Sequence, residues 1–266
     1  MAGAETAFDG YASGYDAHFS ASRTGKMQRD RVWKFLSRFS PAVSPDVLEL
    51  NGGTGEDAVW LAQKGFRIVM TDLSAAMVET TQKKLAAAGL KGETTKADLR
   101  EVPKQFAGRK FNLVFSDFGG LNCLSPEELK IFAGEIKMLL QPNARLAFVI
   151  MGRSCRWERF YFKRKGKVTE ANRRQSKEAV TATIGGLNFP VWYYSPEEFY
   201  AFFENDFLFV KKKPVGLFIP PSYLESWFAK HPALLSFLGL CEKLFSFSSF
   251  SDLADHYYLE MKFREN

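Results

Sequence analysis

The stretch from Val47 to Ala58 constrains the fold of this chain more than any other. It opens with a short apolar run, passes through a glycine turn, and continues into an apolar pattern suited to a helix. Gly53 and Gly55 allow the backbone to approach a ligand closely, and a helix that begins near Glu56 presents free backbone N–H groups at its first turn. The stretch therefore predicts a strand, a loop and a helix that together form a nucleotide-type binding turn.

The glycine turn is equally compatible with a dinucleotide-binding Rossmann turn, so the segments that follow have to be considered. Residues 66–72 form a second strand pattern that ends in Asp72, at the place where a ribose diol binds in such folds. Residues 93–98 form a third pattern that ends in Asp98, and residues 111–116 form a fourth. A ligand is expected where these strands end, because open α/β sheets bind ligands at the carboxyl ends of their strands.

With these motifs in place, the chain resembles the class I S-adenosylmethionine-dependent methyltransferases from about Tyr11 to its C-terminus. In that family an acidic residue in the first strand precedes a Gly-x-Gly turn, and Glu49 with Gly53 and Gly55 matches this pattern. Asn51 departs from it, because it stands where the first glycine of the turn usually stands. Asparagine tolerates left-handed backbone angles better than most residues, so we expect the turn to form.

The resemblance implies a set of residues around S-adenosylmethionine. Asp72 matches the acid that holds the ribose hydroxyls, Leu73 the residue beside the adenine, and Asp98 with Leu99 the adenine-contacting pair. Residues 116–119 match the segment beside the methionine part and the methyl donor. The expected cofactor-binding residues are Glu49, Asn51, Gly52, Gly53, Gly55, Asp72, Leu73, Met77, Asp98, Leu99, Ser116, Asp117 and Phe118.

The alternation of strand and helix patterns over residues 47–151 predicts a mainly parallel sheet with right-handed crossovers and helices on both faces. The resemblance implies a Rossmann-like, seven-stranded sheet whose last strand, residues 256–263, is antiparallel and lies between the fifth and sixth strands. An antiparallel strand begins at the edge where parallel strands end, so Asp255 and His256 are expected near the chemistry.

Local signals predict where individual elements begin and end. Ser125 and Ser195 each open a Ser-Pro-Glu-Glu sequence, which is typical of a capping box with proline at the first helical position. Ser74 is expected to cap the helix after the second strand. Pro142 is expected to end the helix after the fourth strand, so that the fifth strand covers residues 145–151.

The chain divides into an N-terminal helical segment, residues 1–45, and a methyltransferase domain, residues 46–266. In the resembling family such an N-terminal segment closes over the cofactor. Two insertions, at about 153–194 and 220–254, are expected on the substrate side, and the second follows the sixth strand as a lid. Tyr11 and Tyr15 share one helical face, so they contact the substrate or simply pack on the core.

Positive charge is concentrated in one stretch. The whole chain carries a formal net charge of +6, whereas residues 153–178 alone contain ten Lys or Arg residues against three Glu. Such a run is usually a solvated helix face, and the functional alternatives are an anionic substrate, an acidic carrier protein or a membrane surface. Neutralising Arg173 and Arg174 is the natural test of these alternatives.

Several classes of protein are disfavoured by composition. Cys123, Cys155 and Cys241 are widely spaced, with no Cys-x-x-Cys pair and no histidine cluster, so neither structural zinc nor a disulfide is expected. The N-terminus is acidic and lacks the apolar stretch of a signal peptide. The longest apolar run, residues 233–247, is short for a membrane span and is interrupted by Glu242 and Lys243. We therefore expect a cytoplasmic protein.

Catalysis on S-adenosylmethionine needs little chemistry from the protein, because the sulfonium already activates the methyl group. An oxygen acceptor benefits from a base, and histidine titrates in the right range. His256 is the candidate at the sheet edge, while His18 and His231 lie in the lid segments; the alternative for each is a structural role. The expected substrate-side residues are Tyr11, Tyr15, Asn122, Trp157 and Trp192.

Three functions remain open. The 26 Phe residues, many of them in the second half, favour methyl transfer to a small, largely apolar or aromatic acceptor at oxygen, nitrogen or carbon. The basic stretch, residues 153–177, favours a nucleic-acid or protein methyltransferase. Against nucleic acid, no Asn-Pro-Pro-Tyr or Asp-Pro-Pro-Tyr type segment follows the fourth strand. The third possibility is a non-catalytic cofactor-binding module or a nicotinamide oxidoreductase with the same turn.

Overall fold

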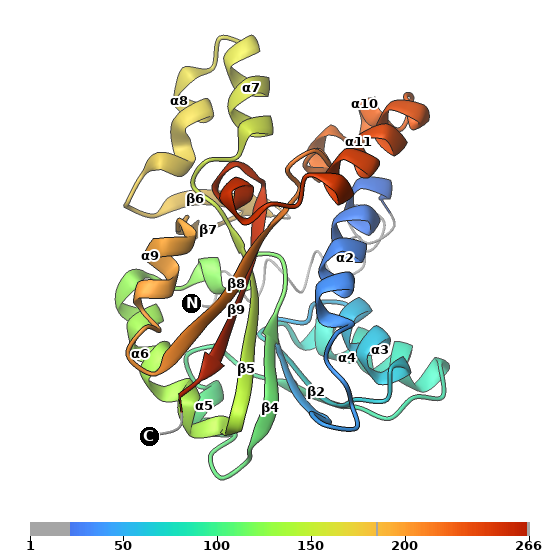
Figure 1. Cartoon of the computed structure of the whole chain (residues 1–266), viewed down its shortest axis with the longest axis vertical. Coiled ribbons are helices and arrows are strands. Elements are labelled where there is room, and N and C mark those ends of the chain that lie inside the picture. Colours follow the sequence, from blue (N-terminus) through green and yellow to red (C-terminus); the bar gives the residue numbers. More distant parts are fainter. Residues whose placement is uncertain (1–21, 185, 265–266) are drawn as a thin grey trace.

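The computed structural model describes residues 22–184 and 186–264, and within them seven strands form one sheet in the order β3-β2-β1-β4-β5-β9-β8 (Figure 1). Strands β1 to β5 run parallel to one another, while β9 pairs antiparallel with both β5 and β8. The predicted Rossmann-like sheet, with its antiparallel last strand between the fifth and sixth, is confirmed. The strands are β1 Asp46–Leu50, β2 Arg67–Asp72, β3 Glu93–Lys96, β4 Phe111–Ser116, β5 Leu140–Met151, β8 Phe207–Val215 and β9 His256–Phe263.

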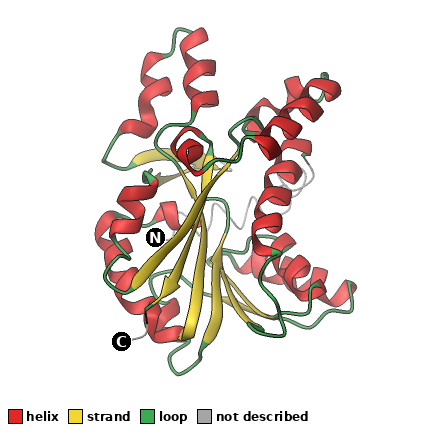
Figure 2. Ribbon diagram, viewed as in Figure 1, coloured by secondary structure: helices red, strands yellow, loops and turns green. Residues whose placement is uncertain are grey.

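Helices cover both faces of the sheet, as predicted (Figure 2). One face packs against α2 and α3, and the other against α5, α6 and α9. The predicted caps are present: Ser74 accepts a hydrogen bond from the backbone N–H of Met77, and Ser125 and Ser195 each form a complete capping box. These helices are α2 Arg23–Leu36, α3 Glu56–Gln63, α4 Ala75–Ala87, α5 Val102–Gln105, α6 Pro126–Ile136 and α9 Pro196–Ala201.

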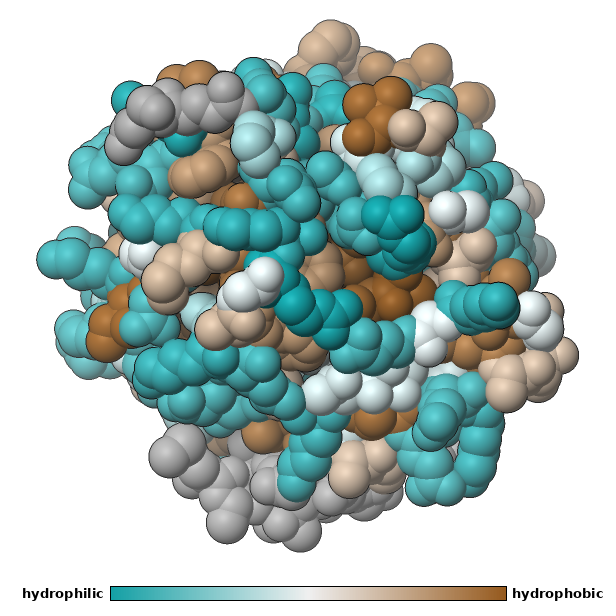
Figure 3. All heavy atoms as spheres, turned by 90° about the horizontal axis from the view of Figure 1, so that it is seen from below, coloured by the Kyte–Doolittle hydropathy of each residue, from teal (hydrophilic) through white to brown (hydrophobic). Residues whose placement is uncertain are grey.

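Two groups of helices lie beyond the carboxyl ends of the parallel strands (Figure 1). The first follows β5 and comprises α7 Arg156–Arg164, α8 Val168–Asn172 and a hairpin of β6 Val180–Ile184 and β7 Leu187–Val191. The second follows β8 and comprises α10 Glu225–Phe228 and α11 Pro232–Leu244. The opposite end of the molecule, seen in Figure 3, is largely hydrophilic, with hydrophobic patches separated by hydrophilic side chains. Short 3₁₀ helices complete the chain: η2 Gly120–Cys123, η3 Lys137–Leu139, η4 Arg173–Gln175, η5 Ser222–Leu224 and η6 Ser248–Leu253.

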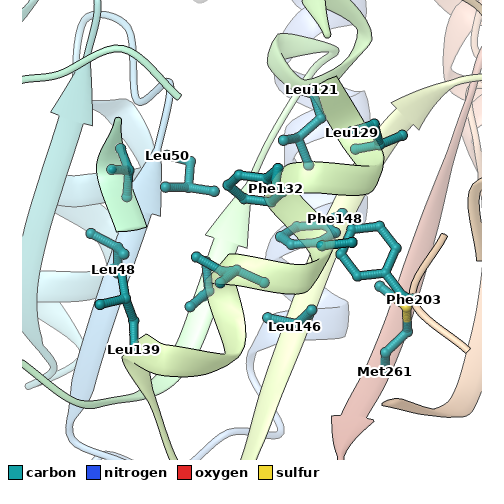
Figure 4. Packing of buried hydrophobic residues seen from close by; sticks show 14 of the residues in the cluster. Leu48, Leu50, Leu121, Leu129, Phe132, Leu139, Leu146, Phe148, Phe203 and Met261 are labelled. Atoms are coloured by element: carbon teal, nitrogen blue, oxygen red, sulfur yellow. The ribbon is translucent and has the colours of Figure 1, made fainter. Parts of the chain in front are cut away.

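The alternation of side chains along β1 decides which residues reach the candidate site. Leu48 and Leu50 point toward α6, where they join the larger core cluster with Phe132 and Phe148 (Figure 4). Val47 faces the other way, toward α2 and α3. Because successive side chains of a strand point to opposite faces, Glu49 lies on the α2 and α3 face as well. A carboxyl group is thereby buried among residues that otherwise form an apolar core.

The prediction for Pro142 is wrong. Helix α6 ends at Ile136, and β5 begins at Leu140, so Pro142 lies inside the strand. The register between β4 and β5 shifts where Phe111 pairs with Leu140 and Leu113 pairs with Arg145, which leaves the proline in a bulge. Proline has no N–H to donate to a sheet ladder, and a bulge is a place in a strand where that donor is not required.

Within the described residues, no helix combines the length and the apolar character that crossing a membrane requires. The same part of the chain contains no group of three or more His, Cys, Asp or Glu side chains arranged to hold a metal ion. The predicted lid segments are helical where they are described, while their role as lids stays a prediction. Tyr11, Tyr15 and His18 lie outside the described residues.

Candidate cofactor and acceptor site

The glycine turn after β1 has the left-handed backbone that its sequence requires. Asn51, Gly53 and Gly55 have φ angles of 47°, 56° and 80°. A Cβ on Gly52 or Gly55 would clash with the side chains of Met70 and Thr81, respectively, so both glycines are required by packing. At Gly53 a Cβ would meet no described atom within 4 Å. The Cβ side of Gly53 is therefore open among the described residues, while its N–H donates to Asp72 and its carbonyl accepts from Thr81.

Asn51 connects the ends of β1 and β4. Its Oδ1 accepts a hydrogen bond from Ser116 Oγ at 2.6 Å, and its Nδ2 donates to the carbonyl of Asp117 at 2.8 Å. A Cβ on Gly120 would clash with the Asn51 side chain, so the glycine provides the room that the asparagine needs. The departure from the usual glycine thus adds a structural link, and both Asn51 and Ser116 are engaged within the protein.

Asp72 fixes the turn against the end of β2. Its two carboxylate oxygens accept hydrogen bonds from the backbone N–H groups of Gly53 and Ser74, each at 2.9 Å. The carboxylate therefore holds the backbone of Gly53 in place. Leu73 is half-buried next to it, whereas Met77 is buried in the first turn of α4.

Asp98 and Leu99 follow β3 at the neighbouring position of the same edge. Arg100 donates from Nη1 to both oxygens of Asp98, at 2.9 and 3.0 Å, and from Nε to Glu128 at 2.6 Å. Glu128 is also the acidic residue of the α6 capping box. Leu99 packs on the larger core cluster. This ion-paired triad is partly open to solvent, so Asp98 is oriented without being desolvated.

A buried charged cluster lies on the α2 and α3 face beneath the turn. It comprises Glu49, Asp57, Asp117 and Arg29, all four of them buried, and is called the turn cluster below. Asp57 forms an ion pair with Arg29, and its Oδ1 accepts a hydrogen bond from Trp33 Nε1 at 2.6 Å. Arg29 therefore brings helix α2 against the first turn of α3.

The turn cluster carries more carboxyl groups than it can compensate. Burial raises the pKa of Glu49 well above its ordinary value, and the nearby carboxylates Asp57 and Asp117 raise it further, while Arg29 offsets only part of this. Burial and Asp57 likewise raise the pKa of Asp117. Among the described residues, Glu49 Oε2 and Asp117 Oδ2 find no hydrogen-bond partner. Such buried acceptors favour a ligand that brings a cation and N–H donors.

Phe118 links the turn cluster to the last strand. Its φ angle of 43° is rare for a non-glycine residue, which indicates that its surroundings hold it in place. The Arg29 guanidinium lies 5.2 Å from the centre of its ring, and the His256 ring packs edge-on against it at 5.3 Å. One aromatic ring thus separates the turn cluster from His256.

His256 begins β9 at the edge where the parallel strands end. It pairs in register with Met151 of β5 on one side and Val215 of β8 on the other. Its Nδ1 lies 3.3 Å from Asp255 Oδ2. Among the described residues this nitrogen has no partner with hydrogen-bond geometry, so Asp255 lies beside the imidazole without donating to it or accepting from it.

A second buried charged cluster holds Asp255. Arg174 donates from Nη2 to Asp255 Oδ1 at 2.8 Å and to Glu158 Oε2 at 2.9 Å, and Arg173 donates from Nε to Glu158 Oε1 at 2.7 Å. We call Glu158, Arg173, Arg174 and Asp255 the insertion cluster. Burial opposes the ionisation of both carboxyl groups, yet His256 and Arg174 hold the pKa of Asp255 well below its ordinary range. Arg174 and Arg173 likewise lower the pKa of Glu158.

The insertion cluster changes the interpretation of the basic stretch. Arg173 and Arg174 are ion-paired with Glu158, and Arg153 is ion-paired with Glu198. These cations hold the insertion to the sheet and are not part of a free cationic surface. Neutralising Arg173 and Arg174 would therefore disturb the structure, so it does not test a docking role of the stretch.

Residues 47–143, which contain the turn and the strands β1 to β4, match the family described as methyltransferase domain. The described fold also matches that of a solved methyltransferase, and Asp72 at the end of β2 holds the glycine turn. The chain contains a methyltransferase domain within the fold of the class I S-adenosylmethionine-dependent methyltransferases.

Two relatives match only part of this chain in sequence. A demethylmenaquinone methyltransferase from Clavibacter sepedonicus is 28% identical over 141 residues, which is 52% of this chain and 54% of that protein. A tRNA 5-carboxymethoxyuridine methyltransferase from Escherichia coli K12 is 27% identical over 86 residues, which is 31% of this chain and 33% of that protein. The chain thus spans about half the length of the first relative and a third of the second.

The fold extends further than the sequence likeness. The crystal structure of an S-adenosylmethionine-dependent methyltransferase from Clostridium acetobutylicum matches 96% of this chain and 98% of its own, with a TM-score of 0.60 and 15% identity. The methyltransferase architecture therefore covers nearly the whole chain, including segments that the family match does not reach.

The predicted substrate-side residues have different surroundings in the structure. The side chain of Asn122 donates to the carbonyls of Trp192 and Met151 and accepts from the N–H of Met151, so it is a structural link between η2 and β5. Trp192 packs on the larger core cluster, and Trp157 packs edge-on against Phe228 of α10. We therefore remove Asn122 from the candidate acceptor site.

The sequence reasoning missed three residues of the methyltransferase site: Arg29, Asp57 and Arg174. Asp57 lies inside the glycine-turn stretch, and an acidic residue in the first turn of a helix is a signal that could have marked it. Arg29 and Arg174 lie in basic stretches and have no local signal of burial. Burial raises the pKa of the Cys123 thiol to about 11.

Proposed function

We propose that this chain transfers a methyl group from S-adenosylmethionine to a small, largely apolar or aromatic acceptor at oxygen, nitrogen or carbon. The observation that carries the proposal is the surplus of buried carboxyl groups in the turn cluster, where Glu49 lies against Gly52 of the glycine turn. A dinucleotide brings phosphates to this position, and phosphates are repelled by Glu49 and Asp117. An amino-acid ammonium is attracted by them.

The donors and acceptors present fit S-adenosylmethionine. Among the described residues, Glu49 Oε2 and Asp117 Oδ2 have no hydrogen-bond partner, so they are the proposed acceptors for the ammonium of its amino-acid end. Asp72 with Leu73 and Asp98 with Leu99 are the residues proposed to hold the ribose and the adenine. When bound, the cofactor supplies a methyl group that its sulfonium has already activated. The residues of the chain then have to orient the acceptor and exclude water.

His256 is the proposed base for an oxygen acceptor. Asp255 remains ionised because His256 and Arg174 lower its pKa, and its Oδ2 lies 3.3 Å from Nδ1 of His256, the residue proposed to take the acceptor proton. Phe118, which packs against His256, covers the imidazole on the side of the turn cluster. The proton is thereby held away from the buried carboxyl groups of the turn cluster.

An apolar acceptor is supported by a pocket of about 460 Å³ beside the insertion cluster. Leu217, in its wall, follows Gly216, whose carbonyl accepts a hydrogen bond from the backbone N–H of Asp255 at 3.1 Å. The relative named as a demethylmenaquinone methyltransferase acts on an acceptor of this chemical class. The pocket is lined by Arg156, Trp157, Phe160, Leu217, Phe218, Phe250 and Leu253.

A nucleic-acid acceptor is the second candidate. One relative is named as a tRNA methyltransferase, and α7 carries exposed cations such as Lys163 and Arg164. The apolar lining of the pocket favours the small acceptor over this alternative. The cytoplasmic location expected from the sequence stays a prediction.

Calorimetric titration of the purified chain with S-adenosylmethionine, with its demethylated product and with NAD tests the cofactor. We expect both S-adenosyl compounds to bind and NAD not to bind; the reverse order would point to an oxidoreductase. A screen of phenols, quinones and a tRNA fraction with methyl-labelled cofactor then tests the acceptor class, and label only in tRNA would favour the second candidate.

The base is tested once an acceptor is known. For an oxygen acceptor, His256→Gln should lower kcat by about 10²- to 10⁴-fold, because general base catalysis contributes about that much. His231→Gln is the matched control, since His231 is exposed on the segment before α11 and stacks only on Trp227. Full turnover of His256→Gln at a saturating acceptor concentration would remove the assignment.

A further inference from the structure

Exposed apolar side chains gather at the end of the molecule formed by α7, α10 and α11. This end lies opposite the largely hydrophilic face of Figure 3. The helices contact one another, since Trp157 of α7 packs on Phe228 of α10 with ring centres 5.6 Å apart. We call this end the α7–α11 surface and define it by Phe160, Trp227, Phe237, Leu240, Leu244 and Phe247, all of which are exposed.

Helix α11 is apolar on the face that it turns away from the protein. Its inner face buries Leu235, Gly239 and Glu242, and Met27 of α2 packs closely at Gly239. On its outer face, Phe237 and Leu244 are 60% and 62% exposed. Residues seven apart in a helix lie on the same side, so these two belong to one continuous stripe. A stripe of large exposed apolar side chains marks an interaction surface.

The charge around this stripe is cationic. Arg156, Lys163 and Arg164 of α7 are exposed, as are Lys230 and Lys243 beside and within α11. Every acidic side chain of the described helices α7, α8, α10 and α11 is already engaged. Glu158 is ion-paired with Arg173 and Arg174, and Glu170 is ion-paired with Lys167. Glu225 accepts hydrogen bonds from Arg23 and Thr24. Glu242 accepts hydrogen bonds from the backbone of residues 216–219. The free charge of the surface is therefore positive.

Large apolar side chains, aromatic rings and flanking Lys and Arg together are the composition of a helix that lies in a membrane interface. The apolar stripe enters the acyl boundary, the Trp ring is suited to the headgroup level, and the cations attract anionic headgroups. We propose that the α7–α11 surface docks this chain on an anionic lipid bilayer. A protein partner of ordinary composition is less well matched, because Lys is depleted from protein interfaces, and Lys163, Lys230 and Lys243 are among the cations here.

Docking in this orientation gives the apolar pocket a function. Phe160 belongs both to the pocket wall and to the α7–α11 surface, so the pocket opens where the bilayer would lie. This consequence rests on the proposed function, because it takes the pocket as the entrance for the methyl acceptor. An acceptor dissolved in the bilayer would then enter the pocket without crossing water. The docking itself is independent of catalysis.

The test is co-flotation of the full chain with vesicles of phosphatidylcholine alone and of equal parts phosphatidylcholine and phosphatidylglycerol, with no cofactor present. We expect binding to the anionic vesicles that weakens with added salt. Phe237→Ser with Leu244→Ser should weaken partition at least about tenfold, because each removes a large apolar side chain from the interface. Lys163→Gln with Arg164→Gln should weaken it about 25-fold, since each cation near an anionic surface contributes about fivefold.

Ile131→Ser with Met138→Ser is the matched control. These side chains are also exposed, by 59% and 51%, but lie on α6 and η3, so partition should be unchanged. Because all these positions are exposed, thermal unfolding should verify that each variant folds. The proposal is overturned if the wild-type chain does not float, or if Phe237→Ser with Leu244→Ser floats as well as the control. It is also overturned if light scattering shows a dimer that this variant dissociates, or if an RNA fragment binds the surface in place of vesicles.

Discussion

The two buried charged clusters at the carboxyl edge of the sheet contrast in how their charges are compensated. In the turn cluster, burial and neighbouring carboxyl groups raise the pKa of Glu49 and Asp117, and Arg29 is the cation that opposes them. In the insertion cluster, Arg173 and Arg174 hold Glu158 from both sides, and Arg174 with His256 lowers the pKa of Asp255. The first cluster has a surplus of acid, and the second is balanced.

The difference distinguishes a cluster that binds a ligand from a cluster that stabilises the fold. A buried charge is costly unless a partner compensates it, so an uncompensated cluster persists in a folded protein where a ligand completes it. The turn cluster meets that description, because among the described residues Glu49 Oε2 and Asp117 Oδ2 have no hydrogen-bond partner, and Glu49 lies against Gly52 of the turn. The insertion cluster is complete without a ligand. It attaches α7 and η4 to the beginning of β9 and thereby positions His256.

Removing Arg174 from the insertion cluster should have the largest effect on the free energy of unfolding. Arg174→Met leaves Asp255 and part of Glu158 buried without their cation, and we expect a loss of about 3–5 kcal/mol in the free energy of unfolding. Urea unfolding measures it, with Arg164→Met, an exposed arginine, as the control. Adding Asp255→Asn to Arg174→Met should recover part of the loss. A loss below that of the control would mean that the cluster is not structural.

Glu49→Gln in the turn cluster should lower the affinity for the cofactor without lowering stability. The amide keeps the shape of the side chain but loses the charge, so affinity for S-adenosylmethionine should fall about 10- to 100-fold, the value of a charged hydrogen bond worth about 1.5–3 kcal/mol. The free energy of unfolding should stay the same or rise, because a poorly compensated buried acid is removed. Calorimetry and urea unfolding measure the two effects, with the exposed Glu79→Gln as control. Reduced stability with unchanged affinity would make Glu49 a structural residue.

The pH dependence of stability should also distinguish the clusters. Glu49 and Asp117 have raised pKa values, so the folded chain binds more protons than the unfolded chain above their ordinary pKa values of 4.5 and 3.8. The free energy of unfolding should therefore fall with rising pH, by up to about 1.4 kcal/mol per pH unit for each proton. Asp255 has the opposite sign: its lowered pKa adds stability that is lost as the pH falls below about 4.

Urea unfolding between about pH 5 and pH 8 measures this slope, which Glu49→Gln should reduce and Asp255→Asn should not. An ammonium beside Glu49 favours its ionised form, so binding of S-adenosylmethionine should also release protons. Calorimetry in buffers of different ionisation enthalpy detects that release. Binding without proton release, together with a flat stability profile, would show that the turn cluster is compensated after all.

The parts of the fold that are encoded locally were predictable from the sequence. The Ser125 and Ser195 caps, the glycine turn and the bounds of β4 and β9 depend on residues close together in the chain. The position of His256 at the sheet edge followed from the resemblance together with the geometry of an antiparallel strand. Pro142 was misplaced because a proline signals a helix end and a strand bulge equally well.

The compensation of charge could not be predicted, because it depends on residues far apart in the chain. Arg29 and Asp57 are separated by 28 positions, and Arg174 and Asp255 by 81. Local sequence marks Arg174 as one more cation of a basic stretch, although it is buried. Which cations are internal and which remain on the α7–α11 surface therefore becomes visible only in the folded chain.

Breaking the triad of Asp98, Arg100 and Glu128 should change stability the least. Like the insertion cluster, the triad has two carboxylates, but it pairs them with the single Arg100 in place of two arginines, and it is partly open to solvent. Because exposed ion pairs contribute little, Arg100→Gln should lower the free energy of unfolding by less than about 1 kcal/mol, and added salt should reduce the effect further. Urea unfolding at low and high salt measures it. A loss as large as that of Arg174→Met would show that pairing alone, and not burial of the pair, makes the insertion cluster structural.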